Sequence, residues 1–362
     1  MLPAPDGRRA GTMSTEVVGF VGFSRHRPSF TLETVLNLQS RSSEVFPMAV
    51  ASSVLDLIGS TPMIDVSELS PNPNVRILGK AEFLNPAGSV KDRIARQMIL
   101  EAEEDGTLRP GSVIIEPSSG NTGIAMAMIC RVRGYHLKVV LPENVTQERR
   151  GALLAFGAEI IDSPGPEGSN GAVRRAIELA DQHPEWVFLY QYANEANPRA
   201  HYETTGPEIA ADCPEITHFV AGLGTSGTLL GVGTYLKELN PDVKVLAVEP
   251  PSGERVEGLR SLDDGFIPPV FDKWGGVDLL DGKSIVRPRE SLIWTRRLGD
   301  VGVFAGISSG AALAGAVKVA ERIESGTICF VICDAGWKYL STGAYSDDLD
   351  TAATNVEQVI YF

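Results

Sequence analysis

The sequence predicts an α/β protein with mostly parallel, twisted sheets in two domains. Strand-like apolar runs alternate with helical runs, and the connections between them are short. This alternation is typical of parallel sheets that helices cover on both faces. The 362 residues suffice for two domains. The rhythm restarts after residues 194–198, which we take as the boundary.

These observations divide the chain into four segments. Residues 1–47 are rich in Arg and Ser and have no sustained period, so we expect a disordered extension. The apolar burst at 17–23 is too short for the core of a signal peptide. A weak targeting peptide and a true start near Met48 are the alternatives. The remaining segments are an N-terminal α/β domain, a C-terminal α/β domain and an acidic tail with an apolar end: 48–195, 196–345 and 346–362.

The first domain is expected to alternate four strands with four helices. In the first helix, apolar residues spaced four apart from Val90 to Ala102 form one buried face, and Asp105-Gly106 ends it. The expected strands are 75–83, 112–116, 136–141 and 159–161, and the expected helices are 90–105, 124–133, 147–156 and 170–182.

The second domain is expected to repeat this pattern around an irregular stretch from residue 250 to about 281. Runs rich in β-branched residues indicate the strands, and longer runs with helical period indicate the helices. The expected strands are 217–221, 244–249 and 327–332, and the expected helices are 205–212, 229–239, 289–297 and 311–323.

Composition narrows the function classes. The formal net charge of −14 argues against nucleic acid or an anionic membrane as a partner. The sequence holds no run of 18 apolar residues, so we expect no transmembrane helix. The four cysteines form no CxxC pair and no Cys/His cluster, so we expect no metal site and no disulfide framework. We therefore expect a cytoplasmic protein.

Residues 85–93 form the stretch around which the first domain is organised. An Asn-Pro turn leads to Ser89, interpreted as a helix N-cap, with Asp92 completing a capping box. Lys91 then lies in the first turn of a helix, where the positive end of the helix dipole lowers the pKa of a lysine. Such a lysine suits a Schiff base or a proton carrier. The alternative, which this stretch alone favours, is a surface lysine at a helix start.

Three loops follow a strand and open a helix, at residues 117–123, 222–228 and 305–310. Such loops lie at the carboxyl ends of parallel strands, where ligands bind. The second loop begins with GxGxxG, a weak signal that also fits a plain turn or a dinucleotide site with Glu249 on the ribose. A dinucleotide fingerprint belongs on the first strand of its domain, whereas this one lies deep in the chain. We expect a cup of backbone and hydroxyl donors for a phosphate monoester: Gly224, Thr225, Ser226, Gly227 and Thr228.

The other two loops carry short polar side chains. Residues 118–123 read Ser-Ser-Gly-Asn-Thr-Gly, which suits a bound carboxylate and lacks the lysine of a P-loop. Ser308 and Ser309 precede an Ala-rich helix, and a neutral hydroxyl there could contact a ring nitrogen without imposing a charge.

Taken together, the four motifs resemble the cysteine synthase family of fold-type II (tryptophan synthase β-like) pyridoxal-phosphate enzymes. In order, they are Asn-Pro-x-Gly-Ser-x-Lys-Asp-Arg, Ser-Ser-Gly-Asn-Thr-Gly, Gly-Thr-Ser-Gly-Thr and Gly-Ile-Ser-Ser-Gly. The resemblance extends from about residue 54 to 345. It implies pyridoxal 5'-phosphate as cofactor and a homodimer.

The resemblance also implies a role for each matching residue. Lys91 would form the Schiff base with the cofactor, Asn121 would contact its ring hydroxyl and Ser308 its ring nitrogen. The glycine-rich loop at 224–228 would hold its phosphate. The substrate carboxylate would be held by Ser118, Ser119, Thr122 and Gln191.

The implied reaction is β-replacement on an O-activated serine through an aminoacrylate. The cofactor is the electron sink, and the protein supplies orientation and electrostatics. A serine at the ring nitrogen leaves that nitrogen unprotonated, which favours β-elimination. Lys91, once displaced from the cofactor, is the expected base for the α-proton.

Two further segments, 258–266 and 334–343, resemble the actinobacterial O-phosphoserine sulfhydrylases, which are similar to cysteine synthase B. That likeness implies that Arg260 contacts a substrate phosphate. It also implies that sulfur arrives as a thiocarboxylate on a small ubiquitin-like carrier protein, and that the tail can fold over the cleft. Pro251-Ser252 and residues 273–283 depart from that group, and a surface ion pair of Arg260 with a nearby aspartate is the alternative.

Four other functions remain open on the sequence. The first is an O-acetylserine sulfhydrylase that uses free sulfide, and the second an eliminase similar to threonine dehydratase. The third is a cofactor-binding but inactive regulator that docks a partner's C-terminus. The fourth is a nicotinamide oxidoreductase, which predicts no visible absorbance without added nucleotide.

Overall fold

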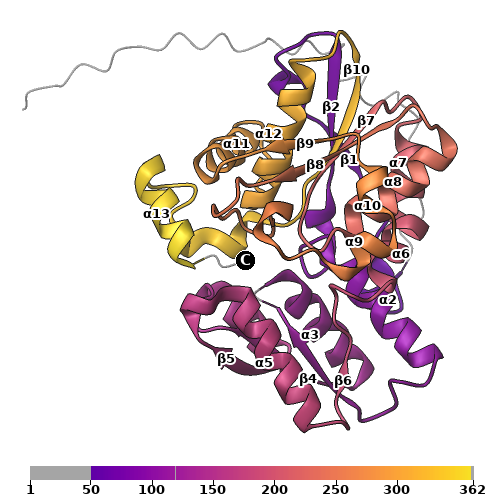
Figure 1. The fold of residues 1–362 in the computed structure, drawn as a ribbon, viewed down its shortest axis with the longest axis vertical. Coiled ribbons are helices and arrows are strands. Elements are labelled where there is room, and N and C mark those ends of the chain that lie inside the picture. The colour runs from indigo at the N-terminus through magenta and orange to yellow at the C-terminus, as the bar shows by residue number, and fades with distance from the viewer. Residues whose placement is uncertain (1–49, 119, 360–362) are drawn as a thin grey trace, which may run out of the picture. The chain divides into compact units, whose positions relative to one another are not determined.

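Six strands form the larger of two sheets in the computed structural model, which describes residues 50–118 and 120–359 (Figure 1). Their spatial order is β1-β2-β10-β7-β8-β9. Only β1 is antiparallel to its neighbour, and the other five strands run parallel. The strands are Met63–Asp65, Val75–Lys80, Gly326–Val331, His218–Gly222, Lys244–Glu249 and Gly282–Ile285 in that order.

Helices cover both faces of this sheet because successive strand residues point to opposite sides. In β7, Phe219 packs into the cluster that contains α8, whereas Val220 packs into the cluster that contains α12. The helices on the two faces are visible on either side of the sheet in Figure 1. They are α7 (Gly206–Asp212) and α8 (Gly227–Leu239) on one face, and α11 (Pro288–Asp300) and α12 (Ile307–Ala320) on the other.

The smaller sheet has four parallel strands in the order β5-β4-β3-β6. Its strands alternate in the same way: Val139 faces the cluster with α2 and α3, and Val140 faces the cluster with α5. The strands are Glu159–Ser163, His136–Pro142, Val113–Pro117 and Val187–Phe188. The helices are α2 (Lys91–Glu104), α3 (Asn121–Arg133), α4 (Gln147–Ala155) and α5 (Gly168–Gln182).

The α/β class with mostly parallel sheets is confirmed, but the sheets do not divide the chain at residues 194–198. Strands β1 and β2 come from the predicted first domain and lie in the larger sheet. The reason is the parallel pairing of β2 with β10, in which Ile77 lies opposite Ile328. The boundary between two domains stays a prediction, and the predicted extension at 1–47 lies outside the described residues.

Five helices begin earlier than the sequence pattern indicated, namely α3, α5, α8, α11 and α12. Helices α3, α8 and α12 start inside the predicted ligand loops, so loop residues form their first turns. The capping box at Ser89 is wrong. Val90 is the N-cap residue, and the Asp92 carboxylate accepts a hydrogen bond from the Ala87 backbone N–H (2.6 Å).

The stretch that looked irregular and the tail both contain helices. Residues 250–281 hold α9 (Pro269–Lys273) and α10 (Gly276–Leu279). In the tail, α13 (Leu349–Val359) buries Ala352 and Val356 against the core beside α11. Between the two halves of the chain, α6 (Ala196–Ala200) continues into a turn of π-helix at His201–Thr205.

Candidate active site

The predicted loops meet around two adjoining cavities. Loop residues at the carboxyl ends of β3 and β7, together with the start of α2, line the first cavity. The second cavity lies behind it, toward β7 and β10. The two share four residues: Lys91, Asn121, Thr225 and Gly258.

Lys91 is half-buried at the first residue of α2 and faces both cavities. Its pKa is lowered mainly by burial, against the opposing influence of Cys333 and Asp334. The sequence argument predicted a lowered pKa for Lys91 from the helix dipole. The pKa is lowered, but the main cause is desolvation of the amine. Within the described residues, no hydrogen bond or ion pair holds this amine, so it is available to react.

The loop at 224–228 is shaped to accept a group with several acceptor atoms. Ser226 has a left-handed backbone (φ 74°), which is strained for a side chain other than glycine. Its buried hydroxyl has no hydrogen-bond partner among the described residues. A Cβ at Gly224 would overlap the Gly258 carbonyl oxygen, and one at Gly227 would overlap the Asn197 amide. Strain and an orphaned hydroxyl both fit a phosphate group at this place.

Asn121 lies between two side chains that the sequence analysis did not single out. Its amide donates to the Asp334 carboxylate (2.8 Å) and accepts from the buried Lys338 amine (2.6 Å). Lys338 also donates to the carbonyls of Ala87 and Gly88, both 3.0 Å away. Burial lowers the pKa of Lys338 to about 8. Lys338 thus ties Asn121 to the turn before Lys91.

Ser308 lies in the second cavity, as the ring-nitrogen role requires. It is buried in the first turn of α12, opposite the cup, and Cys333 lines the same cavity. The neighbouring Ser309 hydroxyl accepts from the Cys333 backbone N–H (2.9 Å). The two serines therefore have different positions, and only Ser308 faces the cavity.

Three of the four predicted carboxylate-binding residues line the first cavity. The Ser118 hydroxyl accepts from the Gly123 N–H (2.9 Å), and the Thr122 hydroxyl donates to Gln191 (2.7 Å). The fourth, Ser119, lies outside the described residues. Behind the loop, burial raises the pKa of Glu116 to about 8, and its carboxyl accepts from the Gln191 backbone N–H.

Arg260 lies in a neighbouring pocket. Its guanidinium is buried against the rings of Tyr192 (4.9 Å) and Phe266 (4.7 Å), which themselves contact each other edge to face. It donates to the Asn170 side chain and to the Tyr192 hydroxyl, both at 3.3 Å. Tyr192 also lines the first cavity, whereas Arg260 lines only the neighbouring pocket. Asp264 accepts from Ser252 and Gly253, and an ion pair of Arg260 with Asp263 or Asp264 stays a prediction.

An ion pair that the sequence did not reveal lies beside the first cavity. Arg149 on α4 contacts Glu257 in the loop after β8 (2.8 Å), and both are buried. Glu257 lines the cavity. The pair joins a helix of the smaller sheet to a loop of the larger one.

A family model described as pyridoxal-phosphate dependent enzyme matches residues 54–334. The chain belongs to this family. Its cofactor is pyridoxal phosphate, and the strained, donor-lined cup and the half-buried Lys91 fit that group. The family rules out the nicotinamide interpretation, and Glu249 is occupied elsewhere, pairing with Lys283 (2.6 Å).

Within the family the chain groups with cysteine synthases. It is 42% identical to the probable cysteine synthase of Bacillus subtilis over 314 residues, which cover 83% of this chain and 99% of that one. It is 40% identical to cysteine synthase B of Escherichia coli over 299 residues, covering 82% and 97%. The structure resembles the cysteine synthase of Entamoeba histolytica with a TM-score of 0.77 at 31% identity, covering 86% and 96%.

The fold is also shared with a solved structure whose name is not that of a cysteine synthase. The crystal structure of O-ureido-L-serine synthase matches with a TM-score of 0.77 at 37% identity, covering 83% of this chain and 97% of that one. Within the described residues, no helix of this pyridoxal-phosphate enzyme is long and apolar enough to cross a membrane. In the same part of the chain, no group of three or more His, Cys, Asp or Glu side chains could hold a metal ion.

Proposed function

We propose that this enzyme makes cysteine by replacing the β-substituent of an O-activated L-serine, with O-phosphoserine favoured over O-acetylserine. When bound, pyridoxal phosphate withdraws electrons from the substrate α-carbon. Lys91 takes the α-proton, since burial holds its pKa low and favours the neutral amine. The cup at 224–228 binds the cofactor phosphate, Asn121 its ring hydroxyl and Ser308 its ring nitrogen.

The substrate carboxylate is assigned to the first cavity. Thr122 and Gln191 are joined by a hydrogen bond, which fixes their side chains at the cavity wall. Ser118 and Ser119 complete this loop. The arrangement orients the substrate so that its α-proton faces Lys91 across the same cavity.

The position of Arg260 is the observation that favours O-phosphoserine as the donor. A guanidinium held against two aromatic rings presents a cation in a fixed plane, which suits a phosphate dianion. The chain as a whole is acidic, so a dianionic leaving group needs a local cation of this kind.

Replacing Arg260 by alanine tests this assignment. We expect kcat/KM for O-phosphoserine to fall about 10-fold to 100-fold, the effect of losing one or more charge-assisted hydrogen bonds. The value for O-acetylserine should change less than about 3-fold, because that donor carries no dianion. The matched control is Arg175→Ala, which removes an equal charge from the exposed side of α5. Equal losses for both donors in Arg260→Ala would remove the phosphate role.

O-Acetylserine with free sulfide is the second candidate, and one observation favours it. Arg260 is already engaged by Asn170 and Tyr192, and it lies in a pocket adjacent to the one with Lys91. Solved structures that this chain resembles include an O-acetylserine dependent cystathionine beta-synthase from Helicobacter pylori (36% identity, TM-score 0.77). The donor comparison above separates the two candidates. An inactive regulator is disfavoured because Lys91, Asn121 and Ser308 are all present at the cavities.

We propose a cytoplasmic homodimer that accepts sulfur from a thiocarboxylated carrier protein or as sulfide. The four cysteines are free thiols in the structure, which suits a reducing compartment. The proposal of a carrier protein rests on segment 334–343, which resembles the same segment of enzymes that use such a carrier. This segment includes Asp334 and Lys338, the two residues that contact Asn121.

A further inference from the structure

The segment from Ala196 to Thr205 lies directly behind the predicted phosphate cup. It comprises α6 and the π-helical turn. Turns of π-helix are rare in proteins, and those that occur are frequently found at functional sites. Three of its polar side chains are fully buried, namely Asn197, His201 and Thr205. None of them lines the cavities around Lys91.

Asn197 donates a hydrogen bond to one cup hydroxyl. Its side-chain N–H group lies 2.9 Å from Thr225 Oγ1, and it also donates to the Gln191 carbonyl (2.9 Å). Because the Thr225 oxygen is the acceptor here, the hydroxyl proton of Thr225 is free to point into the cup.

His201 contacts a second cup hydroxyl. Its Nε2 lies 3.2 Å from Thr228 Oγ1, and its Nδ1 lies 2.9 Å from Thr205 Oγ1. Burial, with Arg93 and Lys91 nearby and only Glu208 opposing, lowers the pKa of His201 well below its usual value. A neutral imidazole has one N–H donor and one acceptor nitrogen. Thr205 can satisfy the acceptor with its own proton.

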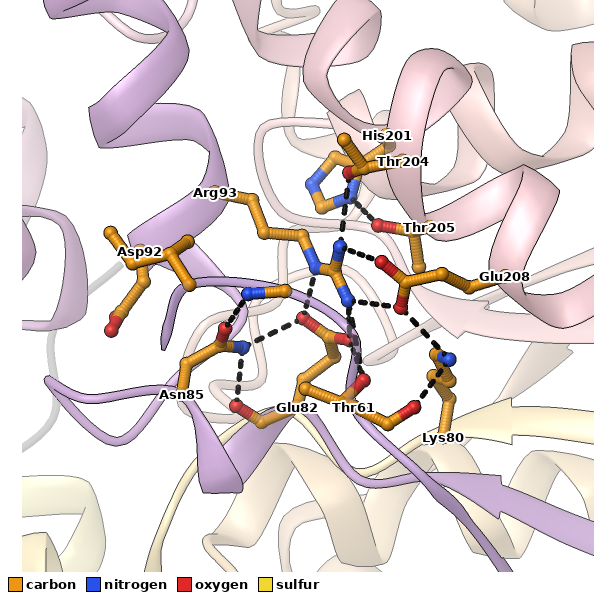
Figure 2. Close-up of polar contacts among 12 residues, drawn as sticks. Thr61, Lys80, Glu82, Asn85, Asp92, Arg93, His201, Thr204, Thr205 and Glu208 are labelled. Carbon is orange, nitrogen blue, oxygen red and sulfur yellow. Dashed lines mark hydrogen bonds and ion pairs between the residues drawn. The ribbon is translucent and has the colours of Figure 1, made fainter. Parts of the chain in front are cut away.

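The close approach of this segment to α8 is built into both elements. A Cβ at Gly231 would overlap the Pro198 carbonyl oxygen and press on His201. Arg93 on α2 donates to the Thr204 hydroxyl (3.0 Å), so the helix that carries Lys91 also fixes the π-helical turn. Figure 2 shows His201 and Thr205 beside the buried guanidinium of Arg93.

We propose that Asn197 and His201 are positioning residues that make the Thr225 and Thr228 hydroxyls donate to the cofactor phosphate. For His201 this requires the tautomer with the proton on Nε2, so that the Thr228 oxygen accepts and its proton faces the cup. The inference deepens the proposed function, because it rests on assigning residues 224–228 to that phosphate.

The test is the dissociation constant of the cofactor, measured by absorbance titration of protein freed of cofactor. The comparison ligand is pyridoxal, which lacks the phosphate. In His201→Met we expect pyridoxal phosphate to bind about 10-fold to 100-fold more weakly, the range for a lost hydrogen bond to a charged group. Pyridoxal binding should change less than about 3-fold. His201→Gln keeps a donor near the Nε2 position and should restore most of the affinity.

A double-mutant cycle with Thr228→Val distinguishes positioning from a general loss of structure. If His201 acts through Thr228, His201→Met will weaken binding little further in the Thr228→Val background. Asn197→Leu should show the same relation to Thr225→Val. Equal weakening of pyridoxal and pyridoxal phosphate, or full additivity in both cycles, would overturn the proposal. Absence of cofactor binding by the unaltered enzyme would instead refute the proposed function itself.

Discussion

Replacing Lys91 by alanine will remove the visible absorbance of the cofactor-loaded protein and lower kcat by about 10³-fold or more. Both effects have one cause, since the amine is proposed to bind the cofactor covalently and to move the α-proton. Lys91 is the lysine that faces both cavities, and within the described residues nothing else holds its amine. The absorbance spectrum checks the loss of the cofactor's visible band, and steady-state rates check the loss of turnover.

The matched control for this variant is Lys273→Ala. Lys273 is an exposed lysine on α9 that pairs with Glu195 (3.0 Å). It should leave both the spectrum and the rate unchanged, because surface ion pairs of this kind contribute little. An undiminished visible band in Lys91→Ala would remove Lys91 from cofactor binding, whatever the rate.

Replacing Arg93 by alanine will lower the free energy of unfolding by about 3–5 kcal/mol. The Arg93 guanidinium is buried and donates to both carboxylate oxygens of Glu82 and of Glu208, at 2.7–2.8 Å (Figure 2). Lys80 contacts Glu208 as well (3.0 Å) and also pairs with the more exposed Asp212 (3.4 Å), so two cations serve three anions. Without Arg93, Glu82 stays buried next to Glu208 with one cation fewer. Urea unfolding with a constant m-value measures the loss.

The control Arg96→Ala removes a half-buried arginine one turn along the same helix. It donates one hydrogen bond, to the Ile58 carbonyl (3.0 Å), so we expect a loss of about 1 kcal/mol. A loss in Arg93→Ala no larger than in Arg96→Ala would show that the buried cluster does not stabilise the fold.

The same cluster predicts a pH dependence. Arg93 and Lys80 lower the pKa of Glu208 from 4.5 to about 2, in spite of partial burial. The unfolded state therefore binds more protons between these values. The stabilisation is fully present above pH 4.5 and is lost as the pH falls toward 2. Arg93→Ala should lose less stability over this interval than the unaltered protein does.

Patterns local in the sequence predicted most strands, most helices and the loops of the site, but they missed the short strands β1, β6 and β9. Lys91, Asn121 and the cup meet at two cavities because each follows or opens an element whose place in a parallel sheet is regular. The loop at 305–310 was predicted to follow a strand, which is wrong: it follows helix α11, and Ala305 forms only an isolated antiparallel bridge with Ala335. The pairing of β2 with β10 could not be predicted in this way, since about two thirds of the chain separates the two strands.

The residues near the site that the sequence analysis did not identify share one property: their hydrogen-bond partners are distant in the sequence. Lys338 contacts Ala87 and Asn121, and Asn197 contacts Thr225. Each looks like an ordinary polar residue until the fold brings its partner close. The cause of the lowered Lys91 pKa was missed for the same reason, because burial depends on the packing of other segments.

The absorbance spectrum of the cofactor-loaded, full-length protein tests the central claim most directly. It is recorded first alone, then with O-phosphoserine and, in a separate sample, with O-acetylserine. We predict a visible band that O-phosphoserine changes at lower concentration and faster than O-acetylserine. A change with O-acetylserine alone would keep the enzyme class and exclude Arg260 from donor recognition. No visible band, even after pyridoxal phosphate is added, would contradict the account as a whole.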